Sequence, residues 1–214
     1  MTMLTREVIA ELIEEASWTA RAKSLERLAT RFAQGELSAS EREAATEAFR
    51  VVLYDGEPLV RLVLAESIKF ATDVPRDLLL ALARDTATVA TPVLEHSRLL
   101  GDDDLLAIVQ RFSPAHRFAI AGRRSISGAV AAALCRAGEH AVILRLLNND
   151  DAAVGEQTLH TLLDRLPDQP ALAQAMAKRR LLPASVASRI FATPHRADEN
   201  PALRLVWNRT GSLG

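Results

Sequence analysis

The sequence predicts an all-α protein, built as a HEAT-like α-solenoid in which helical hairpins stack in a row. Composition favours helices, because aromatic residues make up only 4% of the chain while Leu and Ala, both strong helix formers, are abundant. Helix start and stop signals follow one another at short intervals, and alternation of apolar and polar residues is rare. The third observation is an internal repeat with a spacing of 30 residues.

The first two helices are predicted from their amphipathic patterns. Residues 5 to 16 place apolar side chains on one side and glutamates elsewhere, which is typical of a surface helix. Residues 19 to 34 form the second pattern, and Gly35 follows it directly. Glycine is the usual residue for a left-handed C-terminal cap, so we expect this helix to end there.

The next helix starts are predicted from capping residues. Either Ser38 or Ser40 caps the third helix, and Glu43 stands three residues beyond Ser40, as in a capping box. Proline is tolerated in a first helical turn, and negative charge is favourable at the positive end of a helix dipole. These signals mark further starts at Pro58, Pro75 and Pro114, and at Asp102, Asp103 and Asp104.

The internal repeat appears when DGEPLVRLVLAESIKF, from Asp55, is aligned with DTATVATPVLEHSRLL, from Asp85. Ser67 then falls on Ser97, and a second helix follows each segment, PRDLLLALARD and DDDLLAIVQRF. AHRFAIAGRRSIS with GAVAAALCRAG gives a weaker third copy, and NDDAAVGEQTLHTLL with PALAQAMAKRR a fourth. Stacked hairpins cover one another's apolar faces, so the terminal units should be atypical.

One continuous domain with three parts is therefore expected. Residues 1 to 54 would be an N-terminal helical cap, and residues 55 to 191 would hold the repeats. Residues 192 to 214 would be a C-terminal tail with one short helix near Leu203 to Trp207.

The chain is expected to be cytoplasmic. Its N-terminus has glutamates in place of a basic region and an unbroken apolar stretch, which argues against a signal peptide. No window approaches the 18 apolar residues that a membrane span needs, so no membrane contact is expected. The single cysteine, Cys135, cannot form an internal disulfide, and in its Ala-rich run it is expected to be a small apolar side chain.

Charge is distributed unevenly along the chain. Residues 1 to 107 hold 12 Lys and Arg against 19 Asp and Glu, whereas residues 108 to 214 hold 14 against 8. Opposite signs in the two halves suit a charged partner or self-association with a second copy. The same distribution could also be a by-product of solvated helix faces.

His96 is the histidine that raises most questions, because it interrupts the apolar run VATPVLEHSRLL. At 100° per residue it shares a stripe with Val89 and Val93, so it is predicted to face packing partners more than solvent. In the repeat alignment His96 corresponds to Glu66 and Arg124, which predicts a polar ladder of Glu66, His96 and Arg124 across neighbouring helices. The alternative is a structural histidine bound to a backbone carbonyl.

No enzymatic signature accompanies this histidine. Phosphotransfer needs an exposed histidine, and no Cys or His stands three or four residues from another histidine to form a metal site. The chain holds no GxSxG, P-loop or dinucleotide fingerprint. We therefore expect a non-enzymatic protein without catalytic residues, metal or cofactor.

Binding is the remaining class of function. A solenoid offers an extended surface, and an acidic segment of a protein or peptide would suit basic residues on it. The alternative is a nucleic-acid-binding HEAT-like protein, resembling a DNA glycosylase or without catalysis, whose phosphate contacts would include Lys178, Arg179 and Arg180. The pI near 6.5 and the terminal positions of Trp18 and Trp207 argue against it. The candidate partner-binding residues are Arg111, Arg117, Arg123, Arg124 and Arg145.

Three segments carry a resemblance to a known family: LVRLVLAESI, VPRDLLLALARDTATVATPVLEHSRLLGDDDLLAIVQ and HRFAIAGRRSISGAVAAALCRAGEHAVILRLLNNDDA. They resemble domain of unknown function 2336, a bacterial family found chiefly in alphaproteobacteria, from about residue 24 to about residue 165. The strongest segments are LARD, VATPVLEHS and AIAGR. The resemblance implies a HEAT-like helical fold and brings neither an activity nor catalytic residues. Members of the family are often longer than this chain. A regulatory or signalling scaffold is the function that we expect.

Overall fold

A computed structural model describes residues 17–166 and 169–191, and it is all-α over these ranges. The class predicted from composition is thus confirmed. The described residues hold no strand, although Ile126 and Ala152 form an isolated parallel bridge. The helices predicted over residues 5 to 16 and near Leu203 to Trp207 lie outside the described residues. The chain divides into two compact units, which we call the first unit (Met1–Ala119) and the second unit (Ile120–Gly214).

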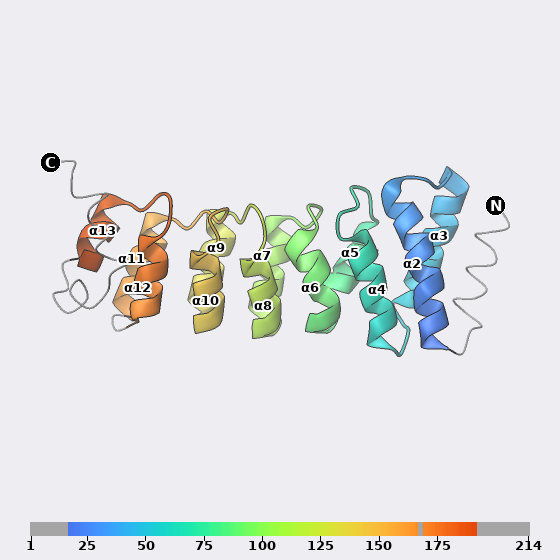
Figure 1. Cartoon of the computed structure of the whole chain (residues 1–214), viewed down its shortest axis with the longest axis horizontal. Coiled ribbons are helices and arrows are strands. Elements are labelled where there is room, and N and C mark those ends of the chain that lie inside the picture. Colours follow the sequence, from blue (N-terminus) through green and yellow to red (C-terminus); the bar gives the residue numbers. More distant parts are fainter. Residues whose placement is uncertain (1–16, 167–168, 192–214) are drawn as a thin grey trace. The chain divides into compact units, whose positions relative to one another are not determined.

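The first unit consists of consecutive helices joined by short turns (Figure 1). The repeated segments from Asp55 and Asp85 each form one helix that is followed by a second helix, as predicted. The last helix of the series crosses the boundary with the second unit. The helices are α2 (Trp18–Gln34), α3 (Ala39–Val52), α4 (Pro58–Ile68), α5 (Arg76–Ala83), α6 (Ala87–His96), α7 (Asp102–Arg111) and α8 (Pro114–Ala121).

Helix α2 ends at Gln34, as its amphipathic pattern predicted, and Gly35 follows as the C-terminal cap. Gly35 has φ 74° and ψ 20°, and its N–H binds the last carbonyls of the helix. This left-handed conformation favours glycine, because a Cβ would be strained there. The predicted C-terminal cap is confirmed.

The cap of α3 settles the choice between the two serines. The Ser38 side chain accepts the Glu41 N–H, and the Glu41 carboxylate accepts the Ser38 N–H at 2.9 Å. The capping box therefore joins Ser38 to Glu41, and the predicted pairing of Ser40 with Glu43 is wrong. The helix begins one residue after Ser38, so Glu43 lies too far along it to reach back.

Replacing Ser38 by alanine is expected to lower the free energy of unfolding by about 1 kcal/mol, because the Glu41 N–H loses its acceptor and the Glu41 carboxylate loses the Ser38 hydroxyl. Ser40→Ala is the matched control and should change it by less than about 0.5 kcal/mol. Urea unfolding followed by circular dichroism measures both. Equal losses for the two variants would contradict the assignment of Ser38 as the cap.

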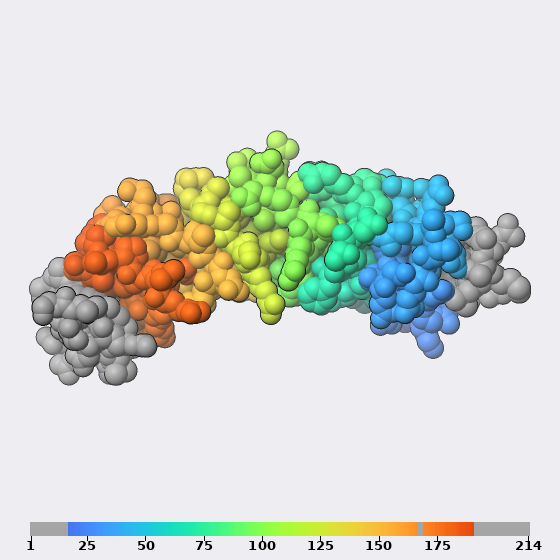
Figure 2. All heavy atoms as spheres, turned by 90° about the horizontal axis from the view of Figure 1, so that it is seen from above, coloured from blue at the N-terminus to red at the C-terminus, as the bar shows by residue number. Residues whose placement is uncertain are grey.

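The first unit is held by packing between alternate helices. Helix α2 packs on α4 and α4 packs on α6, while α5 contacts α6. The Phe32 and Phe49 rings meet edge to face at 5.2 Å, joining α2 to α3. The side chains of successive hairpins lie close together in the space-filling view (Figure 2). Large side chains with almost no exposure form this core, including Leu25, Phe32, Phe49, Leu64, Ile68, Leu78, Leu82 and Leu94.

Asp55 and Asp85, which coincide in the sequence repeat, also have equivalent environments. Arg21 donates to both carboxylate oxygens of Asp55, at 2.8 and 3.0 Å, and Arg61 does the same to Asp85, at 2.6 and 2.8 Å. In both cases the arginine lies on the first helix of the preceding hairpin. Each aspartate also accepts a backbone N–H from the start of its own hairpin, that of Glu57 or Thr86. The aspartates therefore tie neighbouring hairpins together.

The described residues of the second unit contain five further helices, and the packing of these helices corrects the predicted fourth repeat. Helix α10 packs on α12, whereas α11 packs on α9 and α13. The fourth copy was predicted to pair the segments that form α11 and α12. In the structure α10 precedes these two helices along the chain. Helix α11 packs with α9 and α13, whereas α12 packs with α10, so α11 and α12 belong to different rows of helices. The helices are α9 (Gly128–Ala137), α10 (His140–Leu147), α11 (Glu156–Arg165), α12 (Pro170–Ala177) and α13 (Ala184–Phe191).

Candidate functional site

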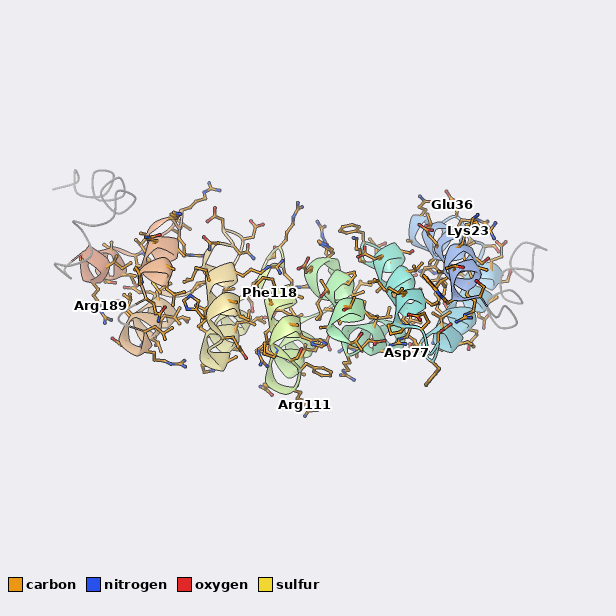
Figure 3. All side chains as sticks on the ribbon, turned by 60° about the horizontal axis from the view of Figure 1, so that its bottom comes forward. Lys23, Glu36, Asp77, Arg111, Phe118 and Arg189 are labelled. Carbon is orange, nitrogen blue, oxygen red and sulfur yellow. The ribbon has the colours of Figure 1, made fainter. Side chains whose placement is uncertain are left out.

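Two of the predicted partner-binding arginines lie in the first unit, and only one of them is exposed. Arg111, the last residue of α7, projects away from the ribbon (Figure 3). Arg117 is half-buried, and its Nη1 donates to the carbonyls of Val109 at 3.0 Å and Phe112 at 2.6 Å. Its guanidinium satisfies the carbonyl groups at the end of α7, which is a structural role.

The other three lie in the second unit. Arg123 is buried, with 6% of its surface exposed, and Arg145 is half-buried with its guanidinium against Gly122, where a Cβ would collide with it. Arg124 is exposed. Of the five predicted residues, Arg111 and Arg124 therefore retain the exposure that a partner contact needs.

Arg179, predicted as a phosphate contact in the nucleic-acid alternative, is also committed internally. Its Nη1 lies 3.0 Å from the Leu147 carbonyl and 3.1 Å from that of Asn149, and its Nη2 lies 2.6 Å from that of Ala152. A longer contact of 3.4 Å reaches Leu146. Burial lowers the pKa of Arg179 below its usual value. Its neighbours Lys178 and Arg180 are exposed.

His96 does not face the core as predicted, because it is exposed. It is the last residue of α6, at the edge of the buried stripe. Its Nε2 lies 3.7 Å from the Glu95 carboxylate, and its ring packs against the ring of Phe70 with the centroids 5.1 Å apart and the ring planes tilted by 42°. The 100° spacing placed His96 on the stripe of Val89 and Val93, but the buried part of this stripe does not extend to the last residue of the helix.

The polar ladder receives no support from the contacts of its members. Glu66 pairs with Lys69 at 2.6 Å, three residues along the same helix, and His96 contacts Glu95 and Phe70. The polar ladder would pair Glu66 with His96 and His96 with Arg124, and the contacts of Glu66 and His96 are with other residues. Arg124 lies in the second unit.

The surface that stands out is the solvent-facing side of α4, which we call the α4 stripe. The opposite side of this helix is buried through Val60, Leu64, Ala65 and Ile68. Leu59 is 44% exposed and Phe70, just after the helix, is 70% exposed. An amphipathic surface helix has polar residues on this side, so an apolar one marks a binding surface. The α4 stripe comprises Leu59, Leu62, Val63, Glu66, Lys69 and Phe70.

A signal for the α4 stripe was present in the sequence. LVRLVLAESIKF places leucine and valine all around the helix, so a single core cannot cover all of them. The repeat alignment used these residues only as matches between copies. This segment has more leucine and valine residues than one buried face of a helix can hold, and that number could have identified the exposed apolar surface.

His160 and Ser185 form a pair that resembles a base and a nucleophile, but the hydrogen positions do not allow that chemistry. Nε2 of His160 lies 3.0 Å from Oγ of Ser185, and Nη1 of Arg189 lies 2.9 Å from Nδ1. A guanidinium only donates, so Nδ1 accepts and a neutral His160 carries its hydrogen on Nε2. Because Nε2 already carries a hydrogen, it cannot accept the proton of the Ser185 hydroxyl. That hydroxyl instead donates to the Glu156 carboxylate.

His116 is buried and structural. Nδ1 lies 2.8 Å from the Ser113 hydroxyl, and Nε2 lies 2.9 Å from the Asp85 carbonyl, to which it must donate. The ring thus links the first turn of α8 to the loop before α6. This is the arrangement that sequence analysis kept as the alternative for His96.

Cys135 is buried on α9, as its Ala-rich surroundings predicted. Burial raises the pKa of its thiol to about 11, against the smaller opposing effect of Arg165, Arg136 and Arg179. The thiolate is the reactive form, so this thiol is poorly suited to nucleophilic chemistry.

In the native protein we expect Cys135 to react with Ellman's reagent at least about tenfold more slowly than in urea-unfolded chain, because both burial and the raised pKa suppress thiolate. Absorbance at neutral pH follows the reaction. Equal rates in native and unfolded protein would show that the thiol is accessible and reactive.

The part of the chain that the structure describes contains no group of three or more His, Cys, Asp or Glu side chains arranged to hold a metal ion. None of its helices has both the length and the apolar composition needed to span a bilayer.

No curated protein and no solved structure matches this sequence. A family model described as an uncharacterised protein conserved in bacteria (DUF2336) matches residues 89–203. The match begins later and ends later than the resemblance in the sequence suggested, so it includes VATPVLEHS and AIAGR but not LARD or the α4 segment. Because it covers more than half of the 214 residues, the chain belongs to the bacterial DUF2336 family.

Proposed function

We propose that this chain is a non-enzymatic interaction module, a HEAT-like stack of helical hairpins that binds a protein or an acidic peptide as a regulatory or signalling scaffold. The observation that carries the proposal is the α4 stripe. Apolar side chains remain at the surface of a helix whose other side is already fully packed. Exposed aromatic groups such as Phe70 are enriched where proteins bind one another.

The charged residues support the same function. Buried or half-buried arginines hold the hairpins together through Asp55, Asp85 and backbone carbonyls. Arg111 and Arg124 remain exposed for an acidic segment. His116 and Cys135 are buried and serve helix linkage and packing, and a binding function needs no more from them.

The test is affinity purification from bacterial lysate with the wild-type chain and with Phe70→Asp. The charge should abolish apolar contact at the α4 stripe, so partner recovery should fall at least about tenfold. Leu181→Asp is the matched control, because Leu181 is 88% exposed and lies in the second unit. It should retain the partner.

Nuclease treatment of the lysate separates the two binding classes. Partners bound through protein contact remain after treatment, whereas partners bridged by nucleic acid disappear. Unchanged recovery with Phe70→Asp, at unchanged helicity by circular dichroism, would contradict a docking role for this surface.

A further inference from the structure

We infer that the turns at one end of the helices of the first unit bind an extended acidic peptide, and we call this surface the loop edge. The inference rests on the proposed function, because it assigns the acidic peptide to a surface separate from the α4 stripe. The turns are residues 53–57 between α3 and α4, 84–86 between α5 and α6, and 112–113 between α7 and α8. The exposed side chains of the loop edge are Trp18, Val51, Tyr54, Arg84 and Arg111.

Hydrogen bonds between hairpins hold the three turns side by side. Arg61 donates to the carbonyl of Asp55 in the first turn and to the carboxylate of Asp85 in the second. Nε2 of His116, just after the third turn, lies 2.9 Å from the Asp85 carbonyl. Arg21 joins the start of α2 to Asp55. A peptide would therefore meet a surface that is already ordered, which lowers the cost of binding.

The apolar part of the loop edge lies around the first turn. Tyr54 is 89% exposed, Val51 51% and Trp18 42%. The Tyr54 N–H binds the Val51 carbonyl at 3.0 Å, so these two residues are close together. Trp18 precedes Arg21 by one turn on the same side of α2. Because Arg21 holds Asp55, this brings Trp18 to the same side of the molecule as Tyr54. Exposed Trp and Tyr side chains are the residues that most often anchor a bound peptide or protein.

The charged part of the loop edge is basic. The three turns contain three acids, and each has a partner. The two aspartates are paired with arginines of the preceding hairpins, and the Glu57 carboxylate accepts the Leu59 N–H at the start of α4. Among the described residues, no hydrogen bond or ion pair engages the side chain of Arg84 or that of Arg111, which projects outward (Figure 3). Two guanidinium groups therefore remain for carboxylates of a partner.

The spacing of these side chains indicates the form of the partner. Tyr54 and Arg84 coincide in the sequence repeat, each directly before an aspartate that binds the preceding hairpin, and Arg111 stands at the next turn. Packed helices lie about 9 Å apart, and an extended peptide advances about 3.3 Å per residue. A fitting peptide therefore has an apolar residue and two acids at intervals of three residues.

A nucleic acid fits this surface less well. Residues 1 to 107 hold 12 Lys and Arg against 19 Asp and Glu, so the surroundings of the loop edge repel a long run of phosphates. Two carboxylates on a short peptide need only the two arginines. Charge complementarity at the loop edge therefore favours the peptide.

Fluorescence anisotropy with a labelled peptide of about ten residues tests the inference on the full chain. The probe carries one tryptophan and two glutamates at intervals of three residues in a glycine–serine background. The wild type should bind it with a Kd on the order of 10–100 µM at low salt. Tyr54→Ser should weaken binding at least about tenfold, because the aromatic contact is lost. Phe70→Ser is the matched control, an exposed aromatic residue after the other end of α4, and should bind as the wild type does.

Charge reversal tests the arginines. The Arg84→Glu/Arg111→Glu variant should bind the glutamate probe at least about tenfold more weakly than the wild type. It should instead bind a probe with lysines in place of the glutamates, which the wild type should not. Arg98→Glu is the matched control, because Arg98 is exposed and lies beyond the opposite end of α6. It should bind the glutamate probe normally, and circular dichroism should show equal helicity for all variants.

A wild-type chain that leaves the glutamate probe unbound up to about 1 mM would overturn the inference, as would normal binding by the charge-reversed variant. Tighter binding of a single-stranded oligonucleotide, lost in that same variant, would overturn the peptide and assign the loop edge to nucleic acid. An unbound probe together with protein capture that still depends on Phe70 would overturn the loop edge and leave the proposed interaction module standing. A bound probe with capture independent of Phe70 would support the loop edge and contradict the α4 stripe.

Discussion

Replacing Arg179 by methionine is expected to lower the free energy of unfolding of the second unit by about 3 kcal/mol. One guanidinium serves the carbonyls at the end of α10 and in the following turn, with its shortest contact, 2.6 Å, to Ala152. Methionine keeps most of the apolar stem but removes every donor, so buried carbonyls lose their partners. The burial that lowers the pKa of Arg179 also limits replacement of these hydrogen bonds by water.

Hydrogen exchange measured by mass spectrometry would locate this effect. Protection should fall over α10 and the turn to Ala152, while α2 in the first unit should keep its protection. Arg180→Met is the matched control: the residue is adjacent but exposed, and its change should stay within about 0.5 kcal/mol. If both variants lost equal stability, the loss would come from charge or helix propensity and the carbonyl contacts would not explain it.

The end of α2 and the start of α7 were predictable because each depends on a few neighbouring residues. Gly35 ends α2 through its own backbone conformation, and Asp104 at the start of α7 binds the N–H of Gly101 within one turn. The repeat from Asp55 to Asp85 was predictable for a different reason. The same structural requirement, an aspartate that holds the preceding hairpin, recurs at the same spacing.

The roles of the arginines were not predictable, because their partners lie far away in sequence. Arg179 reaches carbonyls about 30 residues earlier, and Arg61 reaches an aspartate on the next hairpin. A helical pattern shows which side of a helix a residue occupies but not which backbone groups end opposite it. Exposed and structural arginines, such as Arg124 and Arg123, therefore look alike in the sequence although they are adjacent.

Helix α10 was missed because only two residues, Gly138 and Glu139, separate it from α9. Its sequence HAVILRLL follows the Ala-rich helix so closely that the two read as one apolar stretch. The fourth predicted repeat consequently began one helix too late. A glycine with φ 89° at the end of α9 is the local feature that separates the two helices.

Replacing Arg61 by methionine is expected to destabilise the first unit by about 2 kcal/mol at neutral pH, because the half-buried Asp85 carboxylate loses both of its guanidinium hydrogen bonds. The Asp55 carbonyl loses a donor as well. The double variant Arg61→Met/Asp85→Asn should lose less than the two single losses added together, because no unpaired charge remains. Arg84→Met, an exposed arginine of the same unit, is the control and should change stability by less than about 0.5 kcal/mol.

The pH dependence distinguishes this ion pair from a loss of packing. Burial raises the pKa of Asp85, but hydrogen bonds from Arg61 and Thr86 and the charge of Arg61 outweigh it, so the pKa lies below its usual value. A carboxyl group with a lowered folded-state pKa stabilises the fold above its unfolded value of about 3.9, and this contribution disappears as the pH falls towards the folded value. The difference between wild type and Arg61→Met should therefore be full at pH 7 and shrink below about pH 4. Urea unfolding at a series of pH values measures it, and a difference that stays constant down to about pH 3 would mean that Arg61 acts through packing alone.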